Sequence, residues 1–418
     1  MSRIEAVRGT QDLLPEDAAR WQEAELRIRG VLARYGFGEI RTPVFEHAEL
    51  FRRSLGLGSD VVAKEMYEFA DKGGRQLALR PEGTASVVRA FIEHALPQKG
   101  GRHKLFYSCP VFRYDRPQKG RFRQHHQFGV EVFGNPAPSQ DVEVMDAGDA
   151  ILRELGVTGY ERRINSNGDP ACRPAFEAAL RAFVEGRKDR VCEGCAGYRL
   201  EHNVLRVLDC KVESCRAATA DAPRLVDHLC DACRAHHEAV LAHLRTLGME
   251  VVPDPRLVRG LDYYTRTCFE FVPQDAGQQG TLLGGGRYDG LVELLGGPST
   301  PGVGFGMGVE RVLAAAPPVA VAPSLIAFVL ATTDDAYPRA FRLAQALRRA
   351  GVACELGQEG KSLNSQLRAS GSSGAGWAVF VGAGTGPVGL KDLATHVQED
   401  VAEEAVAGRL ASAASARS

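Results

Sequence analysis

The segment 123–133, RQHHQFGVEVF, alternates in the way that is typical of a β-strand and carries polar side chains on one face. With a period of two, that face contains His125, Gln127, Gly129, Glu131 and Phe133. Gln127 and Glu131 flank a glycine, so an amide and a carboxylate border a position without a side chain. We interpret this as a slot for a small polar ligand, because a carboxylate accepts hydrogen bonds from imidazole or ammonium N–H groups. A solvated strand face with a packing glycine is the alternative interpretation.

A basic connection precedes this strand. The segment DRPQKGRF joins it to the strand-like residues 104–114, which predicts an antiparallel hairpin. Guanidinium groups bind phosphate oxygens through paired hydrogen bonds, so a basic loop beside a polar slot suits a nucleotide phosphate or an RNA end. An exposed hairpin tip would have a similar composition. The basic residues are Arg113, Arg116, Lys119, Arg121 and Arg123.

Three further segments combine polar side chains with glycine or proline. In LRPEGT (79–84), Glu82 could receive an ammonium group, while Thr84 fits the N-cap of the helix that follows. LVRGLDYYTRTCFEF (257–271) places two adjacent tyrosines beside arginine and aspartate, which is unusual for a core strand. GGGRYDGL (284–291) follows three glycines with a tyrosine, which indicates either close backbone approach to a ligand or a tight turn.

Two CxxC pairs occur in the segment 171–250, which has a helical pattern and is rich in alanine, arginine and cysteine. Paired CxxC motifs at this spacing can form a tetrahedral zinc site. We expect such a site to be structural, because it lies apart from the polar slot, and free thiols on helices are the alternative. Cys210 and Cys215 lie between the pairs. The candidate ligands are Cys192, Cys195, Cys230 and Cys233.

The surrounding elements indicate how these segments are positioned. Residues 16–36 have the spacing of an amphipathic helix, and strand-like, glycine-rich segments return at 257–286. After the linker PPVAVAP, strands and helices alternate over 323–405, which predicts a small α/β domain. The final residues, AVAGRLASAASARS, have the composition of a frayed or disordered tail.

The composition limits the class of protein. The chain has 418 residues, of which 44% are hydrophobic and 25% charged, and this excludes a mostly disordered chain. The net charge of −1 requires any RNA-binding surface to be local. The start of the chain lacks a secretory pattern and no apolar run is long enough for a membrane span, so we expect a cytosolic protein without a membrane partner. Its phosphate chemistry, if any, would use arginines, because no phosphate-loop motif is present.

Together these segments resemble a class II aminoacyl-tRNA synthetase, and specifically the histidyl-tRNA synthetase family. RTPVFE is similar to the first class motif, FRYDRPQKGRFRQHHQFGVEVFG to the second and GVGFGMGVERV to the third. LVRGLDYYTRT and GGGRYDGL resemble the two histidine-specific signatures. The resemblance spans residues 3–400.

The resemblance implies an α+β fold: a class II antiparallel-sheet catalytic domain with a helical insertion, followed by a C-terminal α/β anticodon-binding domain. The expected divisions are residues 1–170 and 253–318 for the catalytic domain, 171–252 for the insertion, 323–405 for the anticodon-binding domain and 406–418 for a disordered tail. The first class motif lies at a dimer interface in this family, so a homodimer is implied.

The resemblance also implies roles for individual residues. Glu82 and Thr84 would hold the ammonium group of histidine, Glu131 and Tyr264 its two ring nitrogens, and Tyr288 would close over the ring. The full implied histidine site is Glu82, Gly83, Thr84, Arg113, Gln127, Glu131, Arg259, Tyr263, Tyr264 and Tyr288. ATP would be bound by Arg113, Arg121 and Arg311, and the tRNA acceptor end by Arg116, Gln118, Lys119 and Arg123. The implied catalytic residues are Arg259, Arg113 and Arg311.

The implied activity is histidine–tRNA ligation. L-histidine and ATP would form histidyl-adenylate and pyrophosphate with Mg²⁺ on the β- and γ-phosphates, and histidine would pass to the 3′ end of tRNA(His). The main alternative is the regulatory subunit of ATP phosphoribosyltransferase, a relative that binds histidine and is not a ligase. Such relatives lack the anticodon-binding domain and usually the arginine signature, whereas this chain has Arg259 in LVRGLDYY and a C-terminal domain.

Overall fold

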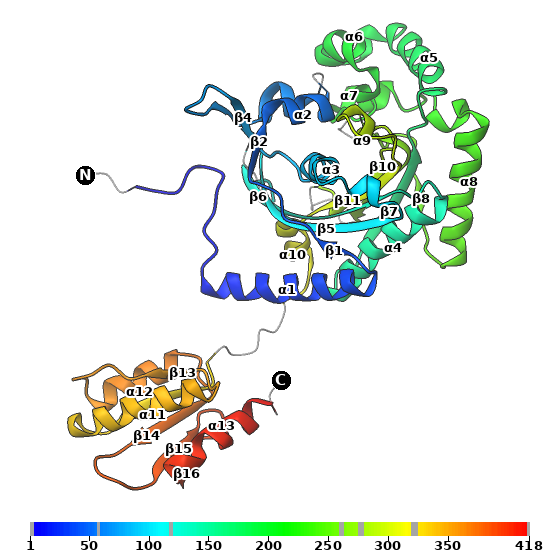
Figure 1. Cartoon of the computed structure of the whole chain (residues 1–418). Helices are drawn as coiled ribbons and strands as arrows, with labels where there is room; N and C mark the ends of the chain where they lie inside the picture. Colours follow the sequence, from blue (N-terminus) through cyan, green and yellow to red (C-terminus); the bar gives the residue numbers. More distant parts are fainter. Residues whose placement is uncertain are drawn as a thin grey trace. The chain divides into compact units, whose positions relative to one another are not determined.

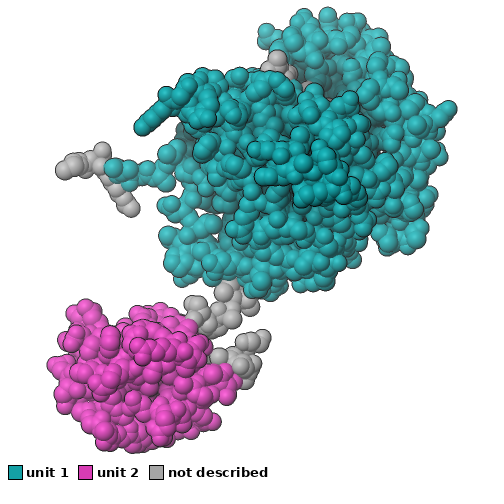
Figure 2. Space-filling view, in the orientation of Figure 1, with its two compact units in different colours: residues 1–319 teal, residues 320–418 magenta. Residues whose placement is uncertain are grey.

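The computed structural model describes residues 4–56, 59–116, 120–258, 263–274, 280–318 and 325–415. The chain divides into two compact units, residues 1–319 and residues 320–418 (Figures 1 and 2). Each unit has its own hydrophobic core.

Unit 1 is built on an eight-stranded sheet, with the order β1-β5-β6-β11-β10-β9-β7-β8 among the described strands (Figure 1). The six central strands pair antiparallel, and the short edge strands β1 and β8 pair parallel to their neighbours. The antiparallel catalytic sheet that the resemblance implies is therefore confirmed. The strands are β1 (Gly38–Glu39), β5 (His103–Phe112), β6 (Gln124–Phe133), β7 (Tyr160–Ser166), β8 (Val252–Pro253), β9 (Thr265–Pro273), β10 (Leu283–Arg287) and β11 (Gly302–Gly308).

One face of this sheet is covered by α1 (Pro15–Arg34) and α4 (Pro138–Glu154). Helix α1 begins with a proline in its first turn, followed by two acidic residues, and it has an arginine in its last turn, which suits the helix dipole. Its buried residues recur every three or four positions, as the sequence predicts, and they pack with Phe128, Val130 and Val132 of β6.

The opposite face carries α2 (Ala48–Leu55), α3 (Thr84–Glu93) and α9 (Leu291–Leu294). Phe133 of β6 packs on this side, so the predicted alternation of β6 between two faces is confirmed. A small sheet lies beside these helices, with the order β2-β4-β3, formed by β2 (Phe45–His47), β3 (Glu68–Ala70) and β4 (Gln76–Leu79). Helix α10 (Val309–Ala315) directly follows β11.

The segment between β7 and β8 is helical. It contains α5 (Arg173–Glu185), α6 (Leu200–His202), α7 (Glu213–Ala218) and α8 (Asp231–Thr246). Most of it packs around a separate core in which cysteines are prominent. The second half of α8 differs, because Val240 and Leu244 are buried in the main core beside α4.

Unit 2 contains a five-stranded mixed sheet of order β13-β12-β14-β15-β16. Its strands are β12 (Ala327–Ala331), β13 (Cys354–Leu356), β14 (Trp377–Val381), β15 (Val388–Asp392) and β16 (Gln398–Val401). Its helices are α11 (Tyr337–Arg349), α12 (Leu363–Ser372) and α13 (Val406–Ser415). The first three strands are parallel, as expected for alternating strands and helices, and the last two add antiparallel pairs.

The predicted disordered tail at 406–418 is wrong over α13. Val406 and Leu410 are fully buried in the core of unit 2. They are four residues apart, so they lie on one face of the helix, and two apolar side chains anchor a segment that is otherwise rich in alanine and serine. Across the described residues, no helix combines the length and the apolar character that crossing a membrane requires.

Candidate active site

Strands β5 and β6 form the predicted hairpin, paired antiparallel from His103 opposite Phe133 to Phe112 opposite Gln124. The basic connection starts at the end of β5. Two residues assigned to the tRNA loop, Gln118 and Lys119, lie outside the described residues.

Glu131 is at the centre of a buried polar network. It is 1% exposed, and one oxygen accepts a hydrogen bond from the Thr84 hydroxyl at 2.6 Å, while the other accepts one from the Tyr288 hydroxyl. Burial raises the pKa of Glu131 from its ordinary value of 4.5 to about 8, although these two hydrogen bonds oppose the rise. Residues from β6, α3 and the turn after β10 therefore meet at one carboxyl group.

Glu82 caps the helix that presents Thr84. Its carboxylate accepts hydrogen bonds from the backbone N–H groups of Thr84 at 2.7 Å and Ala85 at 2.8 Å. Burial raises the pKa of Glu82, against the effect of these bonds. The sequence suggested Thr84 as the cap. Instead, Glu82 accepts the hydrogen bonds of the N–H groups that have no partner within the first helical turn, and the Thr84 hydroxyl bonds to Glu131.

Alternate glycines of β11 make room for the site. A Cβ atom at Gly304 would lie 2.1 Å from Oε2 of Glu131, and one at Gly306 would lie 2.1 Å from Nε2 of Gln127. Gln127 accepts a hydrogen bond from the backbone N–H of Gly83 at 3.3 Å. The glycine alternation in GVGFGMG is thus explained by the side chains of the neighbouring strand β6.

Tyr107 is a site residue that sequence reasoning missed. A Cβ atom at Gly83 or at Gly129 would lie 2.2 Å from its ring. The ring therefore fills the position above Gly129 that the sequence suggested as an open slot. The signal was present in principle, because Tyr107 on β5 pairs directly with Gly129 on β6.

Three tyrosines form an aromatic cluster next to this network. The rings of Tyr263 and Tyr264 lie 4.6 Å apart, and both lie within 6.4 Å of the Tyr288 ring. All three side chains are buried. Arg259, the arginine of the same signature, lies outside the described residues.

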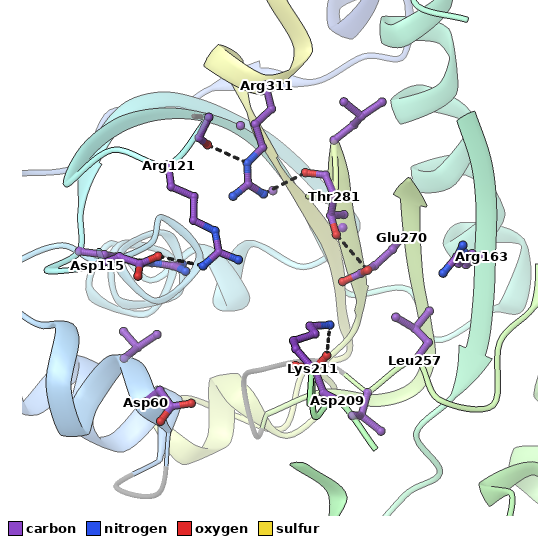
Figure 3. Close-up of a pocket in the computed structure, with 18 of the residues that line it drawn as sticks. Asp60, Asp115, Arg121, Arg163, Asp209, Lys211, Leu257, Glu270, Thr281 and Arg311 are labelled. Carbon is purple, nitrogen blue, oxygen red and sulfur yellow. Dashed lines mark hydrogen bonds and ion pairs between the residues drawn. The ribbon is translucent and has the colours of Figure 1, made fainter. Parts of the chain in front are cut away.

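Figure 3 shows a cavity of about 840 Å³. Gln127 lines this cavity and also belongs to the network through its bond with Gly83. Its lining includes three of the predicted phosphate-binding arginines, Arg113, Arg121 and Arg311. The Nε of Arg311 donates to the carbonyl of Gly120 at 3.1 Å and its Nη1 to that of Thr281 at 3.2 Å, so its guanidinium is fixed.

The cavity has a strongly cationic side. Burial and the neighbouring Arg121 and Arg113 lower the pKa of Arg311. Burial, with Arg113 and Arg311 nearby, lowers the pKa of His125 to about 3, so this imidazole is neutral at physiological pH. Clustered cations favour binding of a polyanion, and three arginines provide the donors that phosphate oxygens accept.

Arg113 also connects the cavity to the polar network, because its Nε donates to the carbonyl of Pro81 at 2.8 Å. The other described residues of the predicted tRNA loop do not line the cavity. Arg116 is exposed, and the Arg123 guanidinium lies 3.9 Å from the centre of the Tyr114 ring.

The helical insertion supplies part of the cavity wall, which sequence reasoning did not predict. Asp209 and Lys211 line the cavity and form an ion pair at 2.6 Å. On the sheet side, Thr281 donates a hydrogen bond to Glu270 at 3.0 Å (Figure 3). No spacing rule connects the two sides, because Asp209 and Lys211 come from the insertion, whereas Glu270 lies on β9 and Thr281 just before β10.

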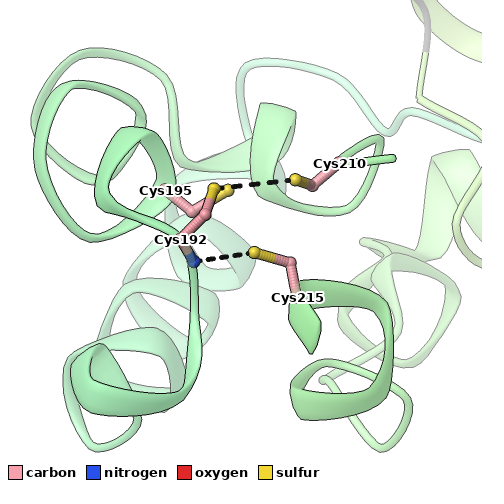
Figure 4. Close-up of side chains that lie close together, drawn as sticks. All are labelled: Cys192, Cys195, Cys210 and Cys215. Carbon is pink, nitrogen blue, oxygen red and sulfur yellow. Dashed lines mark hydrogen bonds between the residues drawn. The ribbon is translucent and has the colours of Figure 1, made fainter. Parts of the chain in front are cut away.

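The cysteines do not group as predicted. Cys192 and Cys195 lie with Cys210 and Cys215 (Figure 4), whereas Cys230 and Cys233 lie with Asp169 and Cys172. The single site predicted from the two CxxC pairs is therefore wrong in its grouping. Motif spacing cannot show which pairs meet, because the fold of the intervening segment decides it.

Comparison with known proteins is consistent with this geometry. The family profile described as histidyl-tRNA synthetase matches residues 9–168 and 171–312, and an anticodon binding domain profile matches residues 320–412. A protein of Caldanaerobacter subterraneus named histidine–tRNA ligase is 46% identical over 405 residues, covering 95% of this chain and 96% of the relative. One of the same name from Anaeromyxobacter dehalogenans is 49% identical over 415 residues, covering 98% and 99%.

Solved structures show the same architecture. The apo histidyl-tRNA synthetase of S. aureus has a TM-score of 0.82 and 35% identity, covering 98% of this chain and all of that one. A Bacillus halodurans structure described as an ATP phosphoribosyltransferase regulatory subunit/histidyl-tRNA synthetase has a TM-score of 0.66 at 20% identity, covering 92% of this chain and all of that one, and shows a shared fold alone. The chain belongs to the histidyl-tRNA synthetase family.

Proposed function

We propose that this chain ligates L-histidine to tRNA(His) in two steps, with ATP as the energy source. The observation that carries the proposal is the adjacency of two different environments. A buried, hydrogen-bonding network around Glu131 adjoins a cavity lined by three arginines, and Gln127 belongs to both. Two relatives named histidine–tRNA ligase, 46% and 49% identical to this chain, support the same reaction.

In the first step, histidine binds at the network. Glu82 and Thr84 receive its ammonium group, and Glu131 and Tyr264 bond to its two ring nitrogens. A carboxyl group with a pKa near 8 can donate or accept a proton at neutral pH, so it can bond to either form of an imidazole nitrogen. A buried polar site of this kind discriminates strongly against side chains that leave its groups unpaired.

ATP binds in the arginine-lined cavity. Arg113 contacts the α-phosphate and Arg311 the γ-phosphate, and Arg121 adds a third cation. By resemblance to the family, Arg259 would reach the α-phosphate from the opposite side. A carboxylate oxygen of histidine attacks the α-phosphorus, the bond to the bridging oxygen breaks, and pyrophosphate leaves. The rate gain comes from positioning and from cations around the developing charge, with no covalent enzyme intermediate.

Mg²⁺ is part of the proposal. Glu270 supplies a carboxylate in the cavity, which suits a hard cation that prefers oxygen ligands. The ion would neutralise charge on the phosphates of ATP. We also include structural zinc in the insertion, because thiol groups gather there.

In the second step, a ribose hydroxyl at the 3′ end of tRNA(His) takes the histidyl group. The loop residues Arg116, Gln118, Lys119 and Arg123 would contact the acceptor end, and unit 2 would bind the anticodon side. We place the protein in the cytoplasm.

A homodimer is also proposed. Three large apolar side chains around the first class motif, Val44, Phe45 and Phe69, are 40%, 53% and 42% exposed in the single chain. Exposed apolar groups at one place favour a protein interface, and burial against a second copy would cover them.

A charging assay tests the proposal. Labelled histidine should be transferred to tRNA(His) and to no unrelated tRNA. The Arg116→Ala variant should raise KM for tRNA and leave histidine activation unchanged, because Arg116 is exposed outside the cavity. A folded protein that binds histidine and ATP but charges no tRNA would overturn the proposal and favour a regulatory role.

A further inference from the structure

Two groups of metal-ligating side chains lie at separate places in the insertion. Each group brings together four residues whose ligand atoms lie within 4.8 Å of one another. We infer that the insertion binds two zinc ions, one held by four thiolates and the other by three thiolates and one carboxylate. The first set is Cys192, Cys195, Cys210 and Cys215, and the second is Asp169, Cys172, Cys230 and Cys233.

The four-cysteine group has the dimensions of a tetrahedral thiolate site (Figure 4). A Zn–S bond of about 2.3 Å with tetrahedral angles places sulfur atoms about 3.8 Å apart. The Sγ atoms of Cys192 and Cys210 are 3.9 Å apart, which fits that value and is far beyond a disulfide bond.

The surroundings of this group suit negatively charged sulfur. The backbone N–H of Cys192 points at Sγ of Cys215, with 2.8 Å between the atoms, and the guanidinium of Arg199 lies 3.7 Å from Sγ of Cys195. Both are hydrogen-bond donors. Donors next to a metal-bound thiolate orient the sulfur atom and stabilise its negative charge.

The second group has the dimensions of a mixed sulfur and oxygen site. Zn–S and Zn–O bonds of about 2.3 and 2.0 Å imply sulfur–oxygen separations of about 3.5 Å. Oδ1 of Asp169 lies 3.4 Å from Sγ of Cys172 and 3.8 Å from Sγ of Cys230. The backbone N–H of Asp169 donates to Sγ of Cys172 at 3.2 Å.

The backbone next to this group leaves room for the sulfur atom of Cys172. Gly168 has a φ of +60°, and a Cβ atom there would lie 2.7 Å from Sγ of Cys172. A side chain at this position would displace a proposed ligand. The glycine therefore allows the close approach of the backbone to Cys172.

The two sites would have different effects on the fold. Asp169 and Cys172 follow β7, where the chain enters the insertion, and Cys230 and Cys233 stand at the start of α8. A metal ion bound by these four residues would hold the first residues of the insertion against the start of α8. Its core is small and contains most of these cysteines, and small cores commonly depend on metals for stability.

The four-cysteine site would instead hold one part of the cavity wall in a fixed position. Cys210 lies between Asp209 and Lys211, and all three line the cavity. The preceding residue, Leu208, is held from the other side by Arg256, whose Nη2 donates to the Leu208 carbonyl at 2.8 Å. Fixing Cys210 on a metal ion fixes the position of both neighbouring charged side chains.

Zinc fits these ligands better than other common ions, because thiolates in tetrahedral geometry favour zinc or iron–sulfur centres, and the carboxylate in the second set is a common zinc ligand. The inference extends the structural zinc proposed for the insertion and does not depend on the ligase reaction, so it can fail while the proposed ligase activity stands.

The test measures metal in the full-length protein purified without chelators. Native mass spectrometry and elemental analysis should find two zinc ions per chain. Cys210→Ser and Cys230→Ser should each retain one ion, and Cys354→Ser, a buried thiol of unit 2, should retain both. Retention of two ions in either of the first two variants, or loss in the control, would overturn the assignment.

A second measurement uses the unmodified protein and so does not depend on the folding of variants. Iodoacetamide should spare the seven cysteines of the two groups until zinc is removed by a chelator, and cobalt substitution should produce thiolate-to-metal absorption bands. A folded protein that takes up no zinc or cobalt after reduction, takes up only one ion, or holds these cysteines as disulfides would contradict the inference.

Discussion

The hydroxyl of Tyr288 donates a hydrogen bond to the carboxyl group of Glu131, 157 positions earlier in the chain. The other oxygen of that carboxyl group accepts a hydrogen bond from the Thr84 hydroxyl. Tyr288 belongs to a histidine signature, Glu131 to the second class motif and Thr84 to the LRPEGT turn. These three segments therefore meet at one buried carboxyl group. Their polar side chains satisfy one another's hydrogen bonds within the fold, which keeps this network ordered.

Replacement of this carboxyl group should change how stability depends on pH. The unfolded chain loses the Glu131 proton near pH 4.5, whereas the folded chain holds it to about pH 8. Burial of Glu131 therefore destabilises wild type increasingly as the pH rises through this window. Glu131→Gln should be more stable than wild type at pH 8, by a few kcal/mol, and about equal to it at pH 4.5.

Urea unfolding of both proteins at several pH values between 5 and 8 measures this gap. Calorimetry should show weaker histidine binding by the variant. A gap that is constant with pH would show that Glu131 has the same pKa in the folded and unfolded chain, and a gap that grows as the pH falls would show that folding lowers its pKa.

Gly306→Ala should weaken histidine binding while the protein still folds. The three atoms nearest to the added Cβ atom all belong to the flexible side chain of Gln127, which must leave its place beside Gly83. We expect KM for histidine to rise on the order of tenfold, the effect of one lost buried hydrogen bond. Gly290→Ala is the matched control, because a Cβ atom there meets nothing within 4 Å. Equal KM values for the two variants would remove Gln127 from the site.

Arg311→Gln should reduce activation without reducing histidine affinity. The guanidinium is held by two backbone carbonyls at the cavity, so its charge is positioned before ATP arrives. Loss of one such group should lower kcat by on the order of 100-fold or more. Arg34→Gln, at an exposed ion pair on α1, serves as the control for loss of an arginine. Unchanged turnover in Arg311→Gln would place the triphosphate elsewhere.

Asp141→Asn should destabilise unit 1. Asp141 is fully buried and accepts hydrogen bonds from His236 at 2.7 Å, from Thr267 at 2.6 Å and from the fully buried Arg287. Removing the negative charge leaves the buried guanidinium with one remaining anion, the partly exposed Asp289 at 3.0 Å, and loss of the fully buried partner costs on the order of 3 kcal/mol.

Denaturant unfolding measures this loss. Glu49→Gln breaks the exposed pair with Arg53 and should change the free energy of unfolding by less than about 1 kcal/mol. Similar small effects for both variants would mean that the buried charge is compensated by other groups.

Local patterns in the sequence predict much of the site. The alternation of β6 correctly places Gln127 and Glu131 on one face, because the two-residue period of a strand is a local property. The hairpin and the helix α1 follow from equally local signals.

The errors concern relations between distant segments. The sequence shows Gly129 but not the Tyr107 ring that fills the space above it, and it shows two CxxC pairs but not that each has other partners. The capping role of Glu82 was missed because Thr84 has the more common residue type for an N-cap. Helix α13 was missed because only two apolar residues anchor it.

Amino-acid-dependent exchange of pyrophosphate into ATP tests the central claim most directly. With purified protein and each amino acid in turn, the account predicts exchange with histidine alone, and a strong loss of that exchange in Arg311→Gln. Histidine binding by folded protein without any exchange, or equal exchange with other amino acids, would contradict it.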